Sequence, residues 1–172
     1  LILFNLDPEP SFFFFFTLDT DLVFGFIALF ALLFCSALVS GAEVALFSLS
    51  QKDIEDTLQE DPSKGKIISK LLEKPKKLLA TLLVANNFIN IGVIILFSYL
   101  GHQLFSAISS TALKFSIEVI IATFLILLFG EIVPKVYAGR NSNKFALRIA
   151  YPIAFLDKLL SPISLPMRKA TI

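Results

Sequence analysis

The sequence predicts an all-α integral membrane protein with three transmembrane helices, a cytoplasmic helical hairpin and a juxtamembrane helix. Hydrophobic residues make up 56% of its 172 residues and charged residues only 17%, and the mean hydropathy is +0.80. The apolar residues gather in three runs, each close to the length that a helix needs to cross a bilayer. The basic residues gather between the first two runs and after the third.

The composition also excludes several functions. The chain is too apolar to be disordered, and its net charge of +1 is not typical of a nucleic-acid-binding protein. The single cysteine, Cys35, excludes an internal disulfide and a cysteine metal cluster. Because the chain has one histidine and no pairing of a nucleophile with a base, we expect that it is not an enzyme.

The first predicted span is Leu22–Val39, whose 18 residues carry no charge. As a helix that rises about 1.5 Å per residue, it measures roughly 27 Å, close to the thickness of the hydrocarbon core. The apolar pattern continues to about Leu49. No Lys or Arg precedes Lys52, and the run starts only at position 22. Both features favour a retained span over a cleaved signal peptide.

The second and third predicted spans contain polar residues. Leu78–Leu100 is an uncharged run of 23 residues. It includes five polar side chains: Thr81, Asn86, Asn87, Asn90 and Ser98. The third span, Phe115–Phe129, has Glu118 near its start and Gly130-Glu131 at its end. We expect Glu118 to be solvated at the outer interface.

The distribution of Lys and Arg predicts the orientation of the chain. Of the 15 Lys and Arg residues, seven lie within 51–78 and seven follow the third run, whereas the loop 101–114 holds only Lys114. Cytoplasmic loops carry the excess of positive charge in multi-pass proteins. We therefore expect the N-terminal segment 1–20 and the 101–114 loop to be extracytoplasmic, and the C-terminus to be cytoplasmic.

Residues 50–74, between the first two spans, have the pattern of a cytoplasmic helical hairpin. Ser50 and Asp53 have the spacing of a capping box, in which each side chain caps the other residue's backbone N–H. Asp61 followed by proline predicts a turn and a second helix start, and Pro75 predicts a break before the next span.

Residues 139–172 follow the three-span domain of residues 21–138. The apolar residues of 143–165 are interrupted by charges and by Pro152 and Pro162, too often for a fourth span. The segment is better explained as an amphipathic helix that lies in the inner membrane interface. No folded cytoplasmic domain follows it, and we expect that this chain is cut from a longer protein.

Polar groups at membrane depth are costly and mark candidate functional sites. Asn86 and Asn90 are four residues apart, so both amides point from one face of their helix. Counted from the cytoplasmic ends of the helices, the two lie roughly 12 and 18 Å deep, Ser40 roughly 14 Å and Glu131 roughly 6–10 Å. All four lie in the inner half of the bilayer, where we expect them to meet.

Backbone features complete this candidate site. Pro134 has no N–H, so the carbonyl of Gly130 loses its helical partner beside Glu131. Gly41 and Gly130 allow helices to approach closely. Because every available donor is an oxygen atom, the set favours a hard cation such as Mg²⁺, Na⁺ or Ca²⁺ over Zn²⁺ or copper. The chemistry alone leaves the choice among the hard cations open.

Three segments carry these residues: Ser40-Gly41-Ala42-Glu43, the sequence ANNFINI at 85–91 and the sequence FGEIVPK at 129–135. They resemble the motifs of the transmembrane domain of the CNNM/CorC family, a hemolysin-C-like family of Mg²⁺ transporters. The resemblance covers about residues 20–172. It implies a homodimer of three-helix domains in a bacterial inner membrane, a belt-like juxtamembrane helix and Na⁺-coupled Mg²⁺ export. Family members usually continue into cytoplasmic CBS domains that bind ATP.

The resemblance also implies a set of Mg²⁺ ligands. The side-chain ligands are Ser40, Asn86, Asn90 and Glu131, and the backbone ligands are the carbonyls of Ala85 and Gly130. Four further residues are expected to support the site or to be structural: Gly41, Glu43, Pro134 and Lys135.

Other interpretations of the same residues are purely structural. The two asparagines are also the kind of residue that joins helices by hydrogen bonds, and Glu131 has a possible ion-pair partner four residues on, in Lys135. Glu43 fits a structural ion pair with a basic residue such as Lys135. In that case the protein is a membrane scaffold or accessory protein that does not transport ions, and association with gliding motility is one such role.

Overall fold

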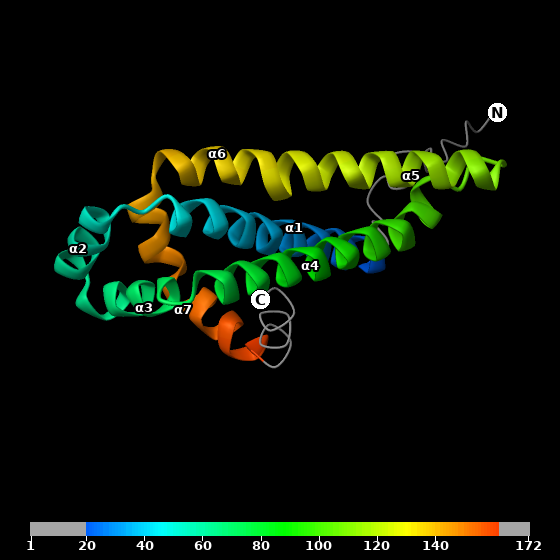
Figure 1. Ribbon diagram of the computed structural model, residues 1–172. Helices are drawn as coiled ribbons and strands as arrows, with labels where there is room; N and C mark the ends of the chain where they lie inside the picture. The colour runs from blue at the N-terminus through cyan, green and yellow to red at the C-terminus, as the bar shows by residue number, and fades with distance from the viewer. Residues whose placement is uncertain (1–19, 162–172) are drawn as a thin grey trace, which may run out of the picture.

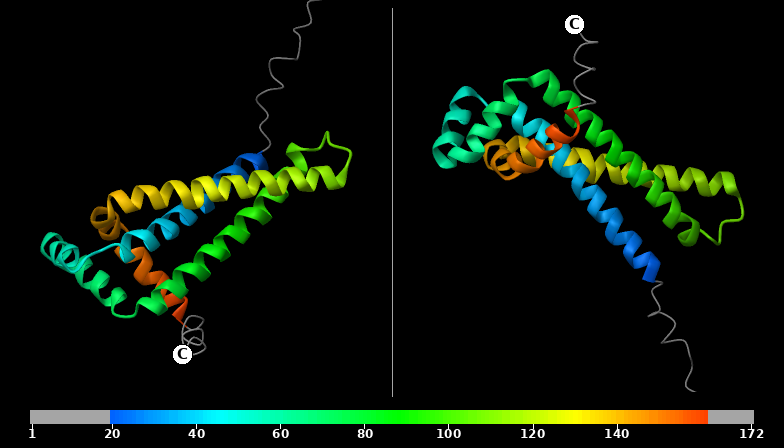
Figure 2. Two further views of the ribbon diagram at one scale, coloured as in Figure 1. Left: turned by 45° about the horizontal axis from the view of Figure 1, so that its top comes forward. Right: turned by 90° about the horizontal axis from the view of Figure 1, so that it is seen from below.

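The computed structural model describes residues 20–161, which form helices and no strand. Three helices are long and apolar enough to cross a membrane: Thr20–Phe47, Pro75–Leu104 and Thr111–Arg140. The first two lie side by side, and the third crosses them at an angle (Figures 1 and 2). The predicted all-α fold with three spans is confirmed. The expected extracytoplasmic segment 1–20, apart from its last residue, and the end of the chain after 161 lie outside the described residues.

The three spans pack through two apolar clusters, one toward each end of the bundle. One cluster joins α1 (Thr20–Phe47), α4 (Pro75–Leu104) and α5 (Thr111–Leu125). Its members are Leu29, Leu33, Val93, Phe97, Leu100, Ala122 and Ile126. The other cluster joins the opposite ends of α1 and α4 to the hairpin and to the last helix. The stretches of α1 and α4 between the two clusters carry the polar residues of the candidate site.

Large apolar side chains cover the outer surface of the spans. Phe24, Phe30, Phe34 and Phe88 are all exposed, and they repeat along helices whose opposite sides are packed. In water such a surface would be a large apolar patch, whereas in a bilayer it contacts hydrocarbon tails. The exposed phenylalanines therefore support the membrane environment that the hydropathy of the chain predicts.

The hairpin consists of α2 (Gln51–Glu60) and α3 (Pro62–Leu72). Ser50 and Asp53 form the predicted capping box, with each side chain bonded to the other's backbone N–H. Asp61 caps the start of α3 by accepting from two backbone N–H groups. The hydrogen bonds donated by Ser50 lower the pKa of Asp53. Asn143 of the last helix also donates to Asp53, at 3.1 Å, and so links the hairpin to that helix.

The third span continues further than the sequence indicates. After α5 the chain forms a π-helical stretch, η1 (Ile126–Ile132), and then α6 (Val133–Arg140), without leaving the helical path. The N–H of Val133 bonds to the carbonyl of Leu128, five residues back. In a regular α-helix the carbonyl of Gly130 would press against the ring of Pro134. The π register changes the hydrogen bonding at this point. The helix therefore continues past Phe129, where the predicted span ends, and passes through Pro134 without a break.

The last helix, α7 (Ser142–Leu159), crosses the end of the bundle beside the hairpin (Figure 2). Its buried residues are Ala146, Leu147, Ile149, Ala150 and Ile153, which join the apolar cluster at that end. Pro152 lies inside the helix without ending it. Phe145 packs over Gly41 of α1, where an added Cβ would lie 2.6 Å from the tip of the phenylalanine ring.

The close packing of the hairpin predicts the effect of a single methyl group. A Cβ added at Gly65 of α3 would lie 2.7 Å from the Cα of Leu58 and 2.9 Å from the carbonyl oxygen of Thr57. Because both are backbone atoms of α2, Gly65→Ala has to push the helices apart, and we expect it to lower the free energy of unfolding by about 1–3 kcal/mol. Thermal unfolding in detergent measures the loss.

The matched control for this substitution is Gly92→Ala. Its Cβ would meet only the side chain of Leu32, at 3.6 Å, which is an ordinary contact, so we expect little change in stability. Equal unfolding midpoints for the two variants would contradict the close contact between the hairpin helices.

Candidate functional site

Four polar side chains from the three spans form one hydrogen-bonded layer between the two apolar clusters. They are Ser36 of α1, Asn86 and Asn90 of α4, and Glu131 of η1. The Ser36 hydroxyl lies 2.7 Å from the Oδ1 of Asn90 and 3.1 Å from the Oδ1 of Asn86. The Nδ2 atoms of Asn86 and Asn90 donate to the Oε1 of Glu131 at 3.4 and 3.3 Å. The layer thus connects all three spans.

The orientation of the two amides gives the layer a direction. Both amide oxygens face Ser36, and both amide nitrogens face Glu131. A hydroxyl has one proton, so Ser36 donates to one asparagine at a time. Glu131 Oε1 accepts both amide bonds, whereas Oε2 accepts none within residues 20–161. One carboxylate oxygen therefore remains available to a ligand.

Ser40 lies one turn along α1 from the layer and takes no part in its hydrogen bonds. Its hydroxyl is fully buried and has no hydrogen-bond partner in the described part of the chain. Ser40 is the serine that the sequence motif predicts for the site, whereas Ser36, which was not predicted, contacts both asparagines directly. The spacing of the two serines was the available signal, since residues four apart share a helix face. Which serine meets the asparagines depends on how α1 packs against α4.

The two motif glycines have different neighbours. A Cβ at Gly130 would lie 2.9 Å from the hydroxyl of Ser36 and 3.4 Å from its Cβ, so this glycine brings η1 against α1 at the polar layer. Close approach of two spans was expected at Gly130, and the structure confirms it. At Gly41 the neighbour is instead Phe145 of α7. Gly41 therefore makes room for the last helix rather than for another span.

The two backbone carbonyls predicted as ligands, those of Ala85 and Gly130, also differ in their surroundings. Ala85 is buried inside the unbroken helix α4, where its carbonyl belongs to the regular ladder of α-helical bonds and keeps one further lone pair. Gly130 lies in the π stretch. Pro134 has no N–H to donate to the carbonyl of Gly130.

Glu43 and Lys135 form an ion pair with a distance of 3.2 Å between carboxylate and amine. The pair links α1 to α6, and both side chains are partly exposed. Lys135 is therefore the partner of Glu43, as one interpretation of the sequence had it, and it does not pair with Glu131. An ion pair this exposed contributes little to stability.

Glu131 has no basic partner among the described residues, because its hydrogen bonds come only from the two asparagine amides. A carboxylate at membrane depth requires compensation by a proton, a cation or strong hydrogen bonds. Within residues 20–161, no three His, Cys, Asp or Glu residues gather in one place as a transition-metal site would require. The layer instead offers oxygen atoms of carboxylate, amide and hydroxyl groups, the ligands that hard cations prefer.

Glu118, which we expected to be solvated, is buried, with only 6% of its surface exposed. Ser98 of α4 donates to its Oε2 at 3.3 Å, and its side chain lies against Gly101. The missing side chain at Gly101 creates the recess that holds the carboxyl group. The prediction that Glu118 is solvated was wrong. It rested on the position of Glu118 near the end of its helix, whereas burial depends on the recess that Gly101 leaves in α4.

The two serines of α1 are expected to respond differently to removal of the hydroxyl. Ser36→Ala deletes the hydrogen bond that the hydroxyl gives to one or the other asparagine, and interhelical bonds of this kind contribute about 0.6 kcal/mol on average and up to about 1.7 kcal/mol. Ser40→Ala removes a buried hydroxyl that has no partner, so stability should stay the same or rise. Thermal unfolding in detergent with a metal chelator compares the two variants. A larger loss for Ser40→Ala would contradict the hydrogen-bonded layer.

Comparison with known proteins agrees with the arrangement of spans, hairpin and polar layer. The family described as "Cyclin M transmembrane N-terminal domain" (CNNM) matches residues 26–171. A UPF0053 protein of Haemophilus influenzae is 33% identical over 139 residues, which are 80% of this chain and 32% of that protein. The UPF0053 inner membrane protein YfjD of Escherichia coli is 29% identical over 132 residues, 77% of this chain and 29% of its own length.

A more distant relative is the metal transporter cnnm-4 of Caenorhabditis elegans, 28% identical over 137 residues, 77% of this chain and 28% of that protein. The chain thus spans about a third of the length of the curated relatives that it matches. The family match, in contrast, extends over most of the chain, from within the first span through the hairpin, the other two spans and α7. The chain is a multi-pass membrane protein and belongs to the CNNM transmembrane domain family.

Proposed function

We propose that this chain is the membrane domain of a Mg²⁺ transporter and that Mg²⁺ binds at the polar layer between α1, α4 and η1. The observation that carries the proposal is the convergence of Glu131, Asn86 and Asn90 from two spans at one level inside apolar packing. One relative of this chain is named as a metal transporter. Na⁺-coupled export, with a homodimer as the working unit and CBS domains beyond this chain, completes the proposal.

Cation binding would use groups that the present hydrogen bonds leave available. Oε2 of Glu131 accepts no bond, and the Ser40 hydroxyl has no partner within the described residues. A half-turn of each asparagine amide exchanges nitrogen for oxygen on the side facing Glu131. With the carbonyls of Ala85 and Gly130, the protein then offers six or more oxygen atoms, enough for the octahedral shell of Mg²⁺.

Ser36 completes the surroundings of the proposed ligands. Its hydroxyl faces both asparagine oxygens and donates to one of them at a time. When the amides turn, their nitrogens face Ser36 and donate to its oxygen instead. Ser36 thus offers the amides a hydrogen-bond partner in either orientation.

A membrane scaffold is the second candidate function. The observation that favours it is the Ser36–asparagine–Glu131 network, whose hydrogen bonds join all three spans. Under this hypothesis the polar layer only holds the helices together, and cations do not change the stability of the protein.

Calorimetry and thermal unfolding separate the two functions. We expect Mg²⁺ to bind the wild-type protein and to raise its stability by about 2.7 kcal/mol when the free concentration is 100 times the dissociation constant. Glu131→Gln and Asn90→Ala should abolish both effects. Glu55→Gln, which removes an exposed carboxylate of α2 far from the layer, is the matched control and should bind Mg²⁺ as the wild type does.

Parallel titrations with Na⁺ and Ca²⁺ test the choice among hard cations. Mg²⁺ binding that persists in both Glu131→Gln and Asn90→Ala would contradict the site. Absence of any cation-dependent stabilisation in the wild-type protein would favour the scaffold instead.

A further inference from the structure

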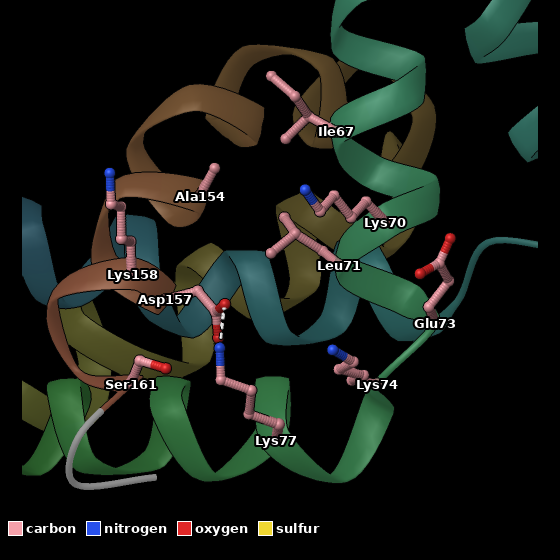
Figure 3. A pocket seen from close by; sticks show the side chains of 10 residues that line it. All are labelled: Ile67, Lys70, Leu71, Glu73, Lys74, Lys77, Ala154, Asp157, Lys158 and Ser161. Carbon is pink, nitrogen blue, oxygen red and sulfur yellow. Dashed lines mark hydrogen bonds and ion pairs between the residues drawn. The ribbon is translucent and has the colours of Figure 1, made fainter. Parts of the chain in front are cut away.

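A basic pocket lies at the hairpin end of the bundle, where α3, the start of α4 and α7 meet. Its volume is about 400 Å³, and Figure 3 shows the side chains around it. Four lysines line it: Lys70, Lys74, Lys77 and Lys158. The acidic residues of the lining are Glu73 and Asp157, so the pocket carries an excess of positive charge.

An internal ion pair fixes one wall of the pocket. The amine of Lys77 lies 2.6 Å from Oδ2 of Asp157, and Thr81 donates to the other carboxylate oxygen at 3.2 Å. The side chains of Lys77 and Asp157 are only 12% and 19% exposed. This ion pair joins α4 to α7, and the Lys77 amine neutralises the charge of Asp157. The carboxylate of Asp157 is therefore not available to the remaining lysines.

Lys70, Lys74 and Lys158 have no such partner. None of the three forms an ion pair or side-chain hydrogen bond within residues 20–161. In Figure 3 the carboxylate of Glu73 is directed away from the Lys77–Asp157 pair, whereas the amines of Lys70 and Lys74 extend toward the middle of the pocket. The amine of Lys158 lies at the outer edge of the pocket (Figure 3). Two uncompensated amines that extend into the cavity, with a third at its edge, form a site for an anion.

The start of α4 adds to the positive potential. Lys74 occupies the N-cap and provides no side-chain hydrogen bond to the helix, and Pro75 follows at the first helical position. The first free backbone N–H groups of α4 and the positive end of its dipole are therefore uncapped beside Lys74 and Lys77.

The position of the pocket points to a membrane lipid as the source of the anion. Lys77 directly precedes Leu78, the first residue of the uncharged run that crosses the membrane. The pocket thus lies at the level of the lipid headgroups. On α7, Tyr151, Phe155 and Leu159 are exposed at intervals of four residues and form an apolar stripe beside Lys158. A basic pocket next to an exposed apolar stripe matches a molecule with a phosphate and hydrocarbon tails.

We propose that this pocket binds the headgroup phosphate of an anionic phospholipid, with Lys70, Lys74 and Lys158 as its ligands and the α7 stripe against its acyl chains. The lipid would fasten the hairpin, the second span and α7 together at the membrane surface. This site shares no residue with the polar layer, so the proposal stands apart from Mg²⁺ binding.

The test uses the full-length protein in lipid nanodiscs of phosphatidylcholine alone or with one quarter phosphatidylglycerol. We expect phosphatidylglycerol to raise the unfolding midpoint of the wild-type protein by roughly 2–4 °C or more and to be retained on the protein in native mass spectrometry. The triple variant Lys70→Gln, Lys74→Gln, Lys158→Gln should lose both effects.

The matched control is the triple variant Lys52→Gln, Lys66→Gln, Lys76→Gln. It removes the same charge from exposed lysines of the hairpin and α4 that do not line the pocket, and it should behave like the wild type. Equal loss in both triple variants would overturn the proposal, because attraction to any basic surface would then explain the effect. Glycerol 3-phosphate added to phosphatidylcholine nanodiscs tests a free anion, and stabilisation equal to that by the lipid would also overturn it.

Discussion

The structure depends on the compensation of one carboxylate inside an apolar bundle. Glu131 is held by two amides of α4, and those amides are held by a hydroxyl of α1. Hydrogen bonds in a membrane cannot be exchanged for bonds to water, so the three spans have to present their polar groups at the same level. This requirement fixes the height and rotation of each span relative to the other two. The apolar clusters on either side then pack around a layer whose geometry is already set.

Much of this arrangement could be predicted from local sequence features. Run length and hydropathy identify the spans, and the capping box at Ser50 and the turn before Pro62 identify the hairpin. The spacing of Asn86 and Asn90 places both on one face of the second span. These predictions succeed because each depends on residues within one or two helical turns.

The features that the sequence could not predict depend on contacts between helices. Ser36 and Ser40 are equivalent in local sequence, and only the packing of α1 against α4 decides which hydroxyl reaches the amides. The burial of Glu118 depends on the empty volume at Gly101, seventeen residues earlier in the chain. In each case the deciding atom belongs to another helix.

The π stretch has a geometric consequence for the whole third span. The buried residues between 111 and 140 are Glu118, Ala122, Ile126, Gly130, Pro134 and Ala138, each four positions after the last. In an α-helix every step of four residues overshoots a full turn by about 40°. Side chains in such a series would therefore move progressively around the helix axis. The wider turn of η1 holds more residues and rotates the series back. The added residue thus offsets part of this drift, so that one series of buried positions meets α4 at Glu118 and α1 at Gly130.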